Sequence, residues 1–335
     1  MSKVASLVTE NNMKEILIIG PGSLTGSRFV ELGKDKFEMY GAGGGMDENL
    51  TGLVSFQSLD ITNQKNVEAA VSSFPGTYVM NFAGATLVDE IEKTRPADST
   101  DKKQLDENIA YKVNVLGTKF LADACKKYDK FPIFISTGFV FDGKDGPYSE
   151  EDQVASLPDD VSWYAWTKIL AENEVKKSGV ENLTIRISYP YRSEYIGKLD
   201  FARNFLKVYD EYKSGIRDSI YPMFADQFLT PTFIDDIPRS VGLLLGKGEA
   251  GVFHLSSPEI VTPYDFCLEL LRVARNVDNP EELIKKGSIV EFQQSHPEIA
   301  KRPVQGGEKS DKIKMLGFTP TSWKEGIRKA FEKKG

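Results

Sequence analysis

The sequence predicts an α/β fold: a Rossmann-type, doubly wound parallel sheet followed by a smaller, mixed α/β C-terminal substrate domain. Short apolar runs alternate with helical patterns from residue 15 to about residue 188, as in parallel sheets with crossover helices. These runs are continuously apolar, which is typical of strands covered on both faces. A glycine-rich turn and the start of a helix follow the first run, the local pattern of a nucleotide-binding sheet.

Six strands are expected before residue 190, at residues 16–19, 37–40, 53–56, 78–80, 133–135 and 183–187. Helices are expected at residues 24–32 and 105–128, and another carries Tyr164 and Lys168. In the second half, a strand, a turn and a helix span residues 230–246, a strand spans 252–255, and helices span 263–275, 280–286 and 322–333.

The chain divides into three expected parts. Residues 1–13 are polar, lack the apolar core of a signal peptide and are interpreted as a flexible N-terminal extension. Residues 14–190 form the expected NAD(P)-binding Rossmann domain. Residues 191–335 form the expected substrate-binding domain, within which residues 230–256 pack back against the Rossmann domain.

Composition excludes several other classes of protein. The net charge of the 335 residues is −7, with no basic stripe for nucleic acid. No apolar run of about 18 residues is present, so no membrane span is expected. Cys125 and Cys267 match no metal or redox spacing, and only two histidines occur, so neither a metal site nor a Ser-His-Asp hydrolase is expected. A reducing, cytoplasmic setting is the simplest interpretation.

The turn after the first strand is the first candidate site. Glycines fall at Gly20, Gly22 and Gly26, with Ser23 and Leu24 at the start of the next helix. Such a turn lets backbone amides approach a pyrophosphate at the positive end of a helix. The spacing matches neither G-x-G-x-x-G nor G-x-x-G-x-x-G, so the turn alone also fits a plain strand-to-helix connection.

Two later strand ends extend the nucleotide-binding interpretation. Asp60 and Ile61 follow the third strand, where a carboxylate could receive an adenine amino group. Asn81, Ala83 and Gly84 end the fourth strand with small residues that suit close approach of a cofactor. In this order they favour nucleotide binding over the simpler alternatives, a helix cap at Asp60 and a turn at Gly84.

The end of the second strand normally separates NAD from NADP, through an acid for the ribose 2′-hydroxyl or an arginine for the 2′-phosphate. Residues 39–45 contain neither. Arg28 is near enough in sequence for a phosphate contact, but a solvated helix arginine is the simpler interpretation. The expected cofactor is therefore NADP or NAD, with the preference left open.

A catalytic set is expected after the fifth strand. Tyr164 and Lys168 are four residues apart, so on a helix they share a face. An ammonium beside a phenol is expected to lower the tyrosine pKa toward working pH, which suits proton exchange with a carbonyl or alcohol. Thr137, at the end of the fifth strand, could hold the same substrate oxygen.

With these parts in order, the chain resembles the extended short-chain dehydrogenases/reductases, and most closely the dTDP-4-dehydrorhamnose reductase family. The resemblance runs from about residue 14 to residue 331. It rests on linked segments at residues 135–137, 140–143 and 146–148, then Tyr164, Thr167 and Lys168, then residues 225–227, 231–232, 301–303 and 316–317, and Trp323.

The resemblance implies hydride delivery from a nicotinamide to the 4-keto group of a nucleotide-linked deoxysugar, as in dTDP-rhamnose biosynthesis. It gives Tyr164 the role of proton donor and Thr137 that of a hydrogen-bond donor to the keto oxygen. It gives Lys168 the nicotinamide ribose, and it places the backbone of Pro190 against the nicotinamide ring.

The chain departs from the family at the substrate end. Where the family usually reads Ser-Thr-Asp-Tyr-Val-Phe, Gly138 and Phe139 replace the acid and the phenol, so a more apolar and roomier pocket floor is expected. Arg192 and Arg203 are further candidates for holding the substrate. The loop at residues 90–107 is also longer than the family norm.

Two alternatives remain open at this stage. A sugar-nucleotide 4-epimerase needs only the same three catalytic groups. A non-catalytic NAD(P)-binding regulatory subunit could retain them as well. Dehydration is disfavoured, because Gly138 and Phe139 supply no acid–base pair after Thr137. A homodimer is left open.

Overall fold

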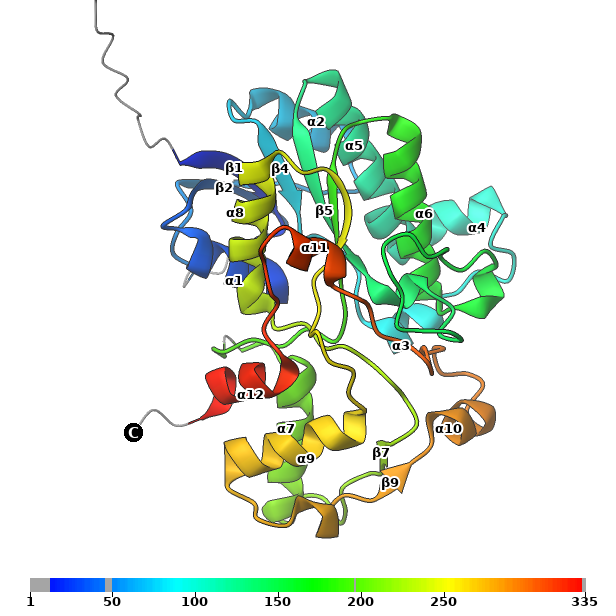
Figure 1. Cartoon of the computed structure of the whole chain (residues 1–335). Helices are drawn as coiled ribbons and strands as arrows, with labels where there is room; N and C mark the ends of the chain where they lie inside the picture. The colour runs from blue at the N-terminus through cyan, green and yellow to red at the C-terminus, as the bar shows by residue number, and fades with distance from the viewer. Residues whose placement is uncertain (1–12, 46–49, 196, 333–335) are drawn as a thin grey trace, which may run out of the picture.

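The computed structural model describes residues 13–45, 50–195 and 197–332. Apart from Met13, the expected N-terminal extension lies outside the described residues. A seven-stranded sheet forms the upper part of the molecule in Figure 1, and three helices of the C-terminal half, α7, α9 and α12, form most of the lower part. The division at residue 190 remains a proposal.

The central sheet is entirely parallel, in the order β3-β2-β1-β4-β5-β6-β8. Its strands are β1 (Lys14–Ile19), β2 (Phe37–Gly43), β3 (Ser55–Ser58), β4 (Tyr78–Asn81), β5 (Phe131–Thr137), β6 (Leu183–Ile187) and β8 (Gly251–His254). The strand order reverses between β1 and β4, and open sheets of this type bind ligands at such a switch point. The predicted doubly wound α/β sheet is confirmed.

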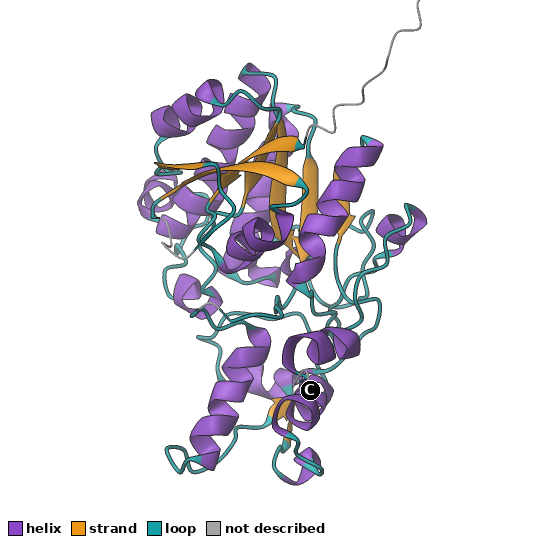
Figure 2. Ribbon diagram, turned by 90° about the vertical axis from the view of Figure 1, so that its left-hand side faces the viewer, coloured by secondary structure: helices purple, strands orange, loops and turns teal. Residues whose placement is uncertain are grey.

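Helices cover both faces of the sheet, which explains why its strands are continuously apolar. One face packs against α1 (Leu24–Gly33) and α8 (Ile237–Lys247). The other packs against α2 (Gln64–Ser73), α5 (Gly117–Lys127) and α6 (Trp163–Ser178). Figure 2 shows the helical layers on either side of the strands.

The prediction of a single helix at residues 105–128 is wrong. The chain forms α4 (Lys102–Glu107), a π-helical turn η1 (Tyr111–Leu116) and α5. Asn108 has extended backbone between them, because its side chain donates to the Thr94 carbonyl at 2.6 Å and accepts from the Trp163 indole at 3.2 Å. Asparagine side chains often compete with helical hydrogen bonds in this way. The long loop thus holds α4 and the end of α3 (Val88–Glu92).

The C-terminal half has its own apolar core. It lies between α7 (Phe201–Lys213), α9 (Pro263–Arg275) and α12 (Trp323–Phe331), around Phe205 and Phe266. A helix was not expected at α7, although its buried residues Ala202, Phe205, Leu206 and Tyr209 recur at helical spacing. The helix expected at 280–286 is also wrong: a 3₁₀ turn (Pro280–Glu282) leads into β9 (Lys286–Gly287), which pairs with β7 (Met223–Phe224).

The chain passes between the two parts of the molecule more than once. After α7 and β7 it returns to the sheet, where α8 covers β1 and β2 and β8 pairs with β6. It then forms α9, β9 and α10 (Ile289–Ser295) before α11 (Asp311–Met315) packs again beside β8. The segment expected at 230–256 therefore lies with the sheet (Figure 1).

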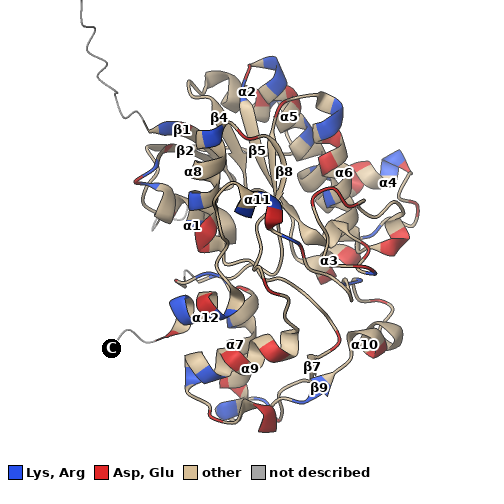
Figure 3. Ribbon diagram, viewed as in Figure 1, with Lys and Arg blue, Asp and Glu red and all other residues tan. Residues whose placement is uncertain are grey.

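Charges of both signs are spread over the helices of both parts of the molecule (Figure 3). Across the described ranges, no helix is long and apolar enough to cross a membrane. In the same ranges, no group of three or more histidine, cysteine or acidic side chains could hold a metal ion.

Candidate active site

A cavity of about 450 Å³ lies at the carboxyl ends of β1, β4, β5 and β6. Residues from both parts of the molecule line it. They include Ser23, Leu24, Asn81, Ala83, Gly84, Ser136, Thr137, Phe139, Tyr164, Lys168, Tyr189, Pro190, Asp200, Asn204 and Arg302. Most of the predicted cofactor and catalytic residues therefore meet at one place.

The glycine turn brings the N-terminus of α1 to this cavity. Gly20 has a φ of 76°, a left-handed conformation that glycine adopts without strain. A Cβ atom on Gly26 would lie 2.5 Å from the Gly20 carbonyl oxygen, so only glycine lets the helix start so close to the turn. Ser23 caps the helix by accepting from the Gly26 amide at 3.0 Å.

Gly22 is in a different situation from Gly20 and Gly26. Its φ is not positive, and among the described residues a Cβ there would meet only the Gly45 carbonyl oxygen, at 3.6 Å. The fold therefore leaves open space above the first turn of α1. The free amides of a helix N-terminus next to such space fit a dinucleotide pyrophosphate.

The remaining cofactor candidates divide into two groups. Ala83 and Gly84 line the cavity, and the buried Asn81 side chain accepts from the Ala83 amide at 3.0 Å, which fixes their turn. Asp60 and Ile61 do not line it. Asp60 is exposed and accepts from the Thr62 amide at 2.9 Å, and Ile61 is buried in the core. Their contact with an adenine stays a prediction.

The catalytic candidates come from two elements that pack together. Thr137 is the last residue of β5, and its hydroxyl accepts from the Phe139 amide at 3.2 Å. Tyr164 and Lys168 lie one helical turn apart on α6, whose start is capped by Ser162. The Lys168 ammonium donates to the Ile135 carbonyl at 2.7 Å, which ties the helix to the same strand.

In the structure, Lys168 does not lower the pKa of Tyr164 as expected. Burial raises the pKa of Tyr164 to about 12, and the Thr137 hydroxyl acts against this rise. Burial also lowers the pKa of Lys168 to about 8, with a smaller opposing effect of the Glu172 carboxylate. The lysine is thus itself desolvated and bonded to a carbonyl, so it does not bring the tyrosine toward phenolate. At neutral pH Tyr164 is a phenol and a proton donor.

Sequence reasoning missed Asn114, which lies in the π-helical turn and is 2% exposed. Its side-chain amide accepts from the Ala85 amide at 2.8 Å and donates to the Thr167 hydroxyl at 2.9 Å. It thereby fixes the turn after β4 to the helix that carries Tyr164. Its only sequence signal was an asparagine within a helical pattern, and π turns often mark functional sites.

The two arginines proposed for substrate do not line the cavity. Arg192 is fully buried and bonds to α1, through the Ser27 hydroxyl at 3.0 Å and the Glu31 carboxylate at 2.5 Å. Arg203 pairs with Asp200 and donates to the Arg192 carbonyl at 2.8 Å. Both hold the loop at 191–194 rather than facing the cavity, because groups within the protein accept from the terminal guanidinium nitrogens of Arg192 and Arg203.

Arg28 was expected to be a solvated arginine on the helix surface, and this prediction is wrong. It is 5% exposed, not solvated, and its guanidinium bonds both oxygens of Asp235, at 2.9 and 2.6 Å. A further bond joins it to Glu31 at 2.8 Å. Arg28 therefore ties α1 to the 3₁₀ turn (Ile234–Asp236) that precedes α8 and is not available to a phosphate.

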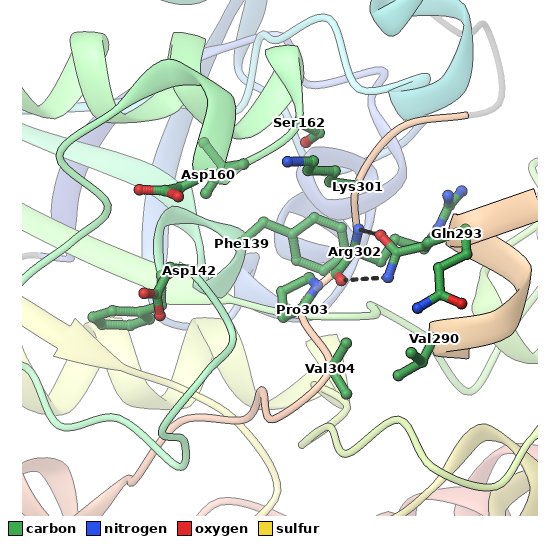
Figure 4. A pocket seen from close by; sticks show the side chains of 13 residues that line it. Phe139, Asp142, Asp160, Ser162, Val290, Gln293, Lys301, Arg302, Pro303 and Val304 are labelled. Carbon is green, nitrogen blue, oxygen red and sulfur yellow. Dashed lines mark hydrogen bonds between the residues drawn. The ribbon is translucent and has the colours of Figure 1, made fainter. Parts of the chain in front are cut away.

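The cation that does face the cavity from the C-terminal half is Arg302. Its guanidinium donates to Asp89 at 2.7 Å, and its backbone is held by the amide of Gln293 at 2.9 and 3.3 Å (Figure 4). Arg302 and Phe139 also line a neighbouring pocket of about 320 Å³ between Asp160 and α10. They therefore stand between the catalytic cavity and a second recess.

The fold and the site define a class: an extended short-chain dehydrogenase/reductase, with a Rossmann sheet and a Tyr-x-x-x-Lys helix beside a strand-end threonine. The family described as "RmlD substrate binding domain" matches residues 13–334, so the chain belongs to that family.

Individual relatives agree with this assignment. A dTDP-4-dehydrorhamnose reductase of Aggregatibacter actinomycetemcomitans is 27% identical over 94% of this chain and 98% of its own length. The solved structure of a dTDP-4-dehydrorhamnose reductase from Clostridium acetobutylicum has 26% identity and a TM-score of 0.72, covering 94% of this chain and 98% of that one. A Bacillus anthracis homologue in complex with NADP, at 23% identity and a TM-score of 0.73, covers 95% of this chain and 99% of its own and supports the fold.

Proposed function

We propose that the protein is an NAD(P)H-dependent reductase of a 4-keto sugar nucleotide, similar in activity to dTDP-4-dehydrorhamnose reductase. The observation that carries the proposal is the meeting of Thr137, Tyr164 and Lys168 in one cavity with the N-terminus of α1. The names of the relatives supply the substrate class. NADP is bound in one structural relative and NAD in another, so the choice between them stays open.

The bound nicotinamide would supply the hydride, and the chain's own residues would do the rest. The Tyr164 phenol, neutral at pH 7, donates a proton to the carbonyl oxygen as charge develops there. Thr137 donates a second hydrogen bond to that oxygen. Lys168 holds the cofactor ribose and places positive charge beside the developing alkoxide, which favours the transition state.

The C-terminal half would hold the sugar nucleotide. Asn204 of α7, Tyr189 and Arg302 face the cavity opposite the α1 turn, so they are placed to contact a molecule whose keto group lies at Tyr164. An arginine suits a phosphate because its planar fork of donors matches phosphate oxygens. The neighbouring recess beyond Phe139 would extend the space for a nucleotide.

The test is an NADH and NADPH oxidation screen against 4-keto sugar nucleotides, with identification of the product. A 4-hydroxy sugar nucleotide formed with matching cofactor consumption supports the proposal. Interconversion of 4-hydroxy sugars without net consumption would indicate an epimerase instead. Tight cofactor binding without turnover of any member of the panel would indicate a binding subunit.

A further inference from the structure

Glu308 fills the space that a side chain at position 138 would occupy. A Cβ atom built on Gly138 would lie 1.3 Å from Glu308 Oε1 and 2.3 Å from its Cδ. The third nearest atom, the Ser188 hydroxyl oxygen at 2.6 Å, is on a rotatable side chain. Position 138 is therefore glycine because a carboxylate from a segment 170 residues later in the chain already occupies its side-chain volume.

The Glu308 carboxylate is buried, and each of its oxygens accepts a hydrogen bond from within the protein. It is 3% exposed, and its two oxygens accept from the hydroxyls of Ser188 and of Thr230, the latter at 2.6 Å. The Glu308 amide donates to the same Thr230 hydroxyl at 2.9 Å. The Ser256 hydroxyl donates to its carbonyl at 3.2 Å. Burial raises the pKa of Glu308, and the bonds from Ser188 and Thr230 oppose this.

These bonds hold residues next to one wall of the candidate active-site cavity, which is formed by Phe139, Tyr189 and Arg302. Phe139 follows Gly138 and Tyr189 follows Ser188, and their rings are 5.3 Å apart. Tyr189 has a φ of 45°, a conformation that a non-glycine residue keeps only when its surroundings hold it there. The Ser188–Glu308 bond is next to that strained residue.

The third member of the wall, Arg302, belongs to the segment that Glu308 anchors. The Gln227 side-chain amide joins Tyr189 to this segment by donating to the Tyr189 hydroxyl at 2.8 Å and the Pro303 carbonyl at 3.0 Å. The Phe228 amide donates to Val304 at 2.8 Å. The position of Arg302 therefore depends on how residues 303–308 are held.

We propose that Glu308 is a positioning residue for the substrate-side wall formed by Phe139, Tyr189 and Arg302, and that Gly138 and Glu308 share one side-chain volume. The acid usual at position 138 in the resembled family is thus replaced by one from the C-terminal segment. The pocket floor is not roomier for having a glycine there. The role in catalysis rests on the proposed reductase function, whereas the shared volume does not.

The test is a double-mutant cycle with Gly138→Asp and Glu308→Ala. Gly138→Asp alone should lower the melting temperature by several degrees, because two carboxyl groups then compete for one buried volume. Glu308→Ala alone should also lower it, by leaving a cavity and two unpaired hydroxyls. The double variant should melt above either single variant. Additive losses would overturn the shared volume, whether or not the protein reduces any sugar.

The positioning role needs a kinetic readout. Glu308→Ala should raise KM for the 4-keto sugar nucleotide by about tenfold or more, as expected for a loss of roughly 1.4 kcal/mol of substrate binding. The effect on kcat and on the cofactor dissociation constant should be much smaller. Glu308→Gln keeps the side-chain length and one acceptor oxygen, so its KM should be close to the wild-type value.

A matched control separates positioning from general loss of stability. Glu150 is another partly buried carboxylate, which accepts from the His254 amide at 2.8 Å and does not line the cavity. Glu150→Ala should lower the melting temperature without changing KM. An unchanged KM in Glu308→Ala, or an equal KM change in both variants, would overturn the positioning role. If the wild type turns over no sugar nucleotide, the proposed function fails and the positioning role with it, while the melting cycle still decides the shared volume.

Discussion

Among single residues, Tyr164 is the one that we propose as the proton donor. Tyr164→Phe keeps the ring and its packing against Phe139 but removes the proton donor. General acid catalysis contributes about 10²–10⁴-fold to rate, so kcat should fall by that amount while the cofactor dissociation constant stays within about twofold. Tyr128→Phe, which removes a hydroxyl bonded to Glu68 far from the cavity, is the control and should retain full activity. Turnover close to wild type in Tyr164→Phe would remove the tyrosine from the mechanism.

Lys168 predicts a pH dependence of cofactor binding. Its pKa is lowered to about 8 by burial, so the ammonium that we propose as a cofactor contact loses its proton as pH rises from 7 to 9. Affinity measured by nicotinamide fluorescence should weaken across that range. Lys168→Met should bind more weakly throughout and show no such dependence. The same slope in wild type and Lys168→Met would assign the titration to another group.

The same lysine also links stability to pH. The pKa of a lysine in an unfolded chain is ordinarily 10.5, and that of Lys168 in the folded protein is about 8. Between these two values only the unfolded chain holds the proton. Stability therefore rises with pH across this window on account of this group. Below pH 8 both states are charged and the folded protein carries the full cost of burying the ammonium.

The sequence predicted the grouping of the three catalytic candidates better than the contacts of the polar residues around them. Spacing and order were enough to place Tyr164 and Lys168 on one helix beside Thr137. By contrast, Arg192 and Arg203 became substrate candidates only through charge and position. The Glu31 partner of Arg192 is 161 residues away in the chain, whereas the Asp200 partner of Arg203 is only three residues away. The contact between Gly138 and Glu308 is equally invisible in sequence, because it joins segments 170 residues apart.

Among the secondary-structure elements, the turn between β1 and α1 contains one glycine expected to serve cofactor binding, Gly22, and one that the fold itself needs, Gly26. Gly22→Val should fold normally, since a Cβ there meets only Gly45 at 3.6 Å, but it should obstruct the pyrophosphate. A steric cost of about 1–3 kcal/mol corresponds to roughly 5- to 150-fold weaker cofactor binding by calorimetry.

Gly26→Val tests the structural half of the same turn. Its Cβ would lie 2.5 Å from the Gly20 carbonyl, so this variant should lose stability as well as cofactor. Gly246→Ala, in α8 with no atom within 4 Å of its Cβ, should be neutral or stabilising by about 0.5–1 kcal/mol. Unchanged cofactor affinity in a folded Gly22→Val protein would move the pyrophosphate site elsewhere.

Most elements with strong local signals were predicted from the sequence, whereas the break in the long helix, which depends on tertiary contacts, was not. The strands and the turn at Gly20 have unbroken apolar runs and a glycine that the backbone needs. The break at Asn108 depends on its bonds to Thr94 and Trp163, which are tertiary contacts. Helix α7 was overlooked although its local signal is strong: Asp200 caps its start, and the apolar residues that pack against α9 recur at helical spacing.

At the scale of the whole molecule, a buried ion pair joins helix α1, which packs on the sheet, to the turn just before α8. Arg28 and Asp235 have side chains 6% and 13% exposed, and Arg28→Met should leave the Asp235 carboxylate buried without its partner. Breaking such a pair costs about 3–5 kcal/mol, measurable by urea denaturation. Lys177→Ala, which breaks an exposed pair with Glu174, should cost at most about 1 kcal/mol. Equal effects of the two variants would show that the Arg28 pair has no special role.

The passage of the chain between its two parts has a consequence for biosynthesis. Every residue proposed to bind the cofactor precedes residue 191, whereas Arg302 and Glu308 are synthesised more than 100 residues later. At ribosomal rates of about 5–20 residues per second, this interval is on the order of ten seconds. During that time a nascent chain would carry the glycine turn and the Tyr164 helix but lack a finished wall for the sugar. We therefore expect newly made protein to acquire dinucleotide affinity before substrate affinity, with the second gained only when residues 302–308 reach the sheet.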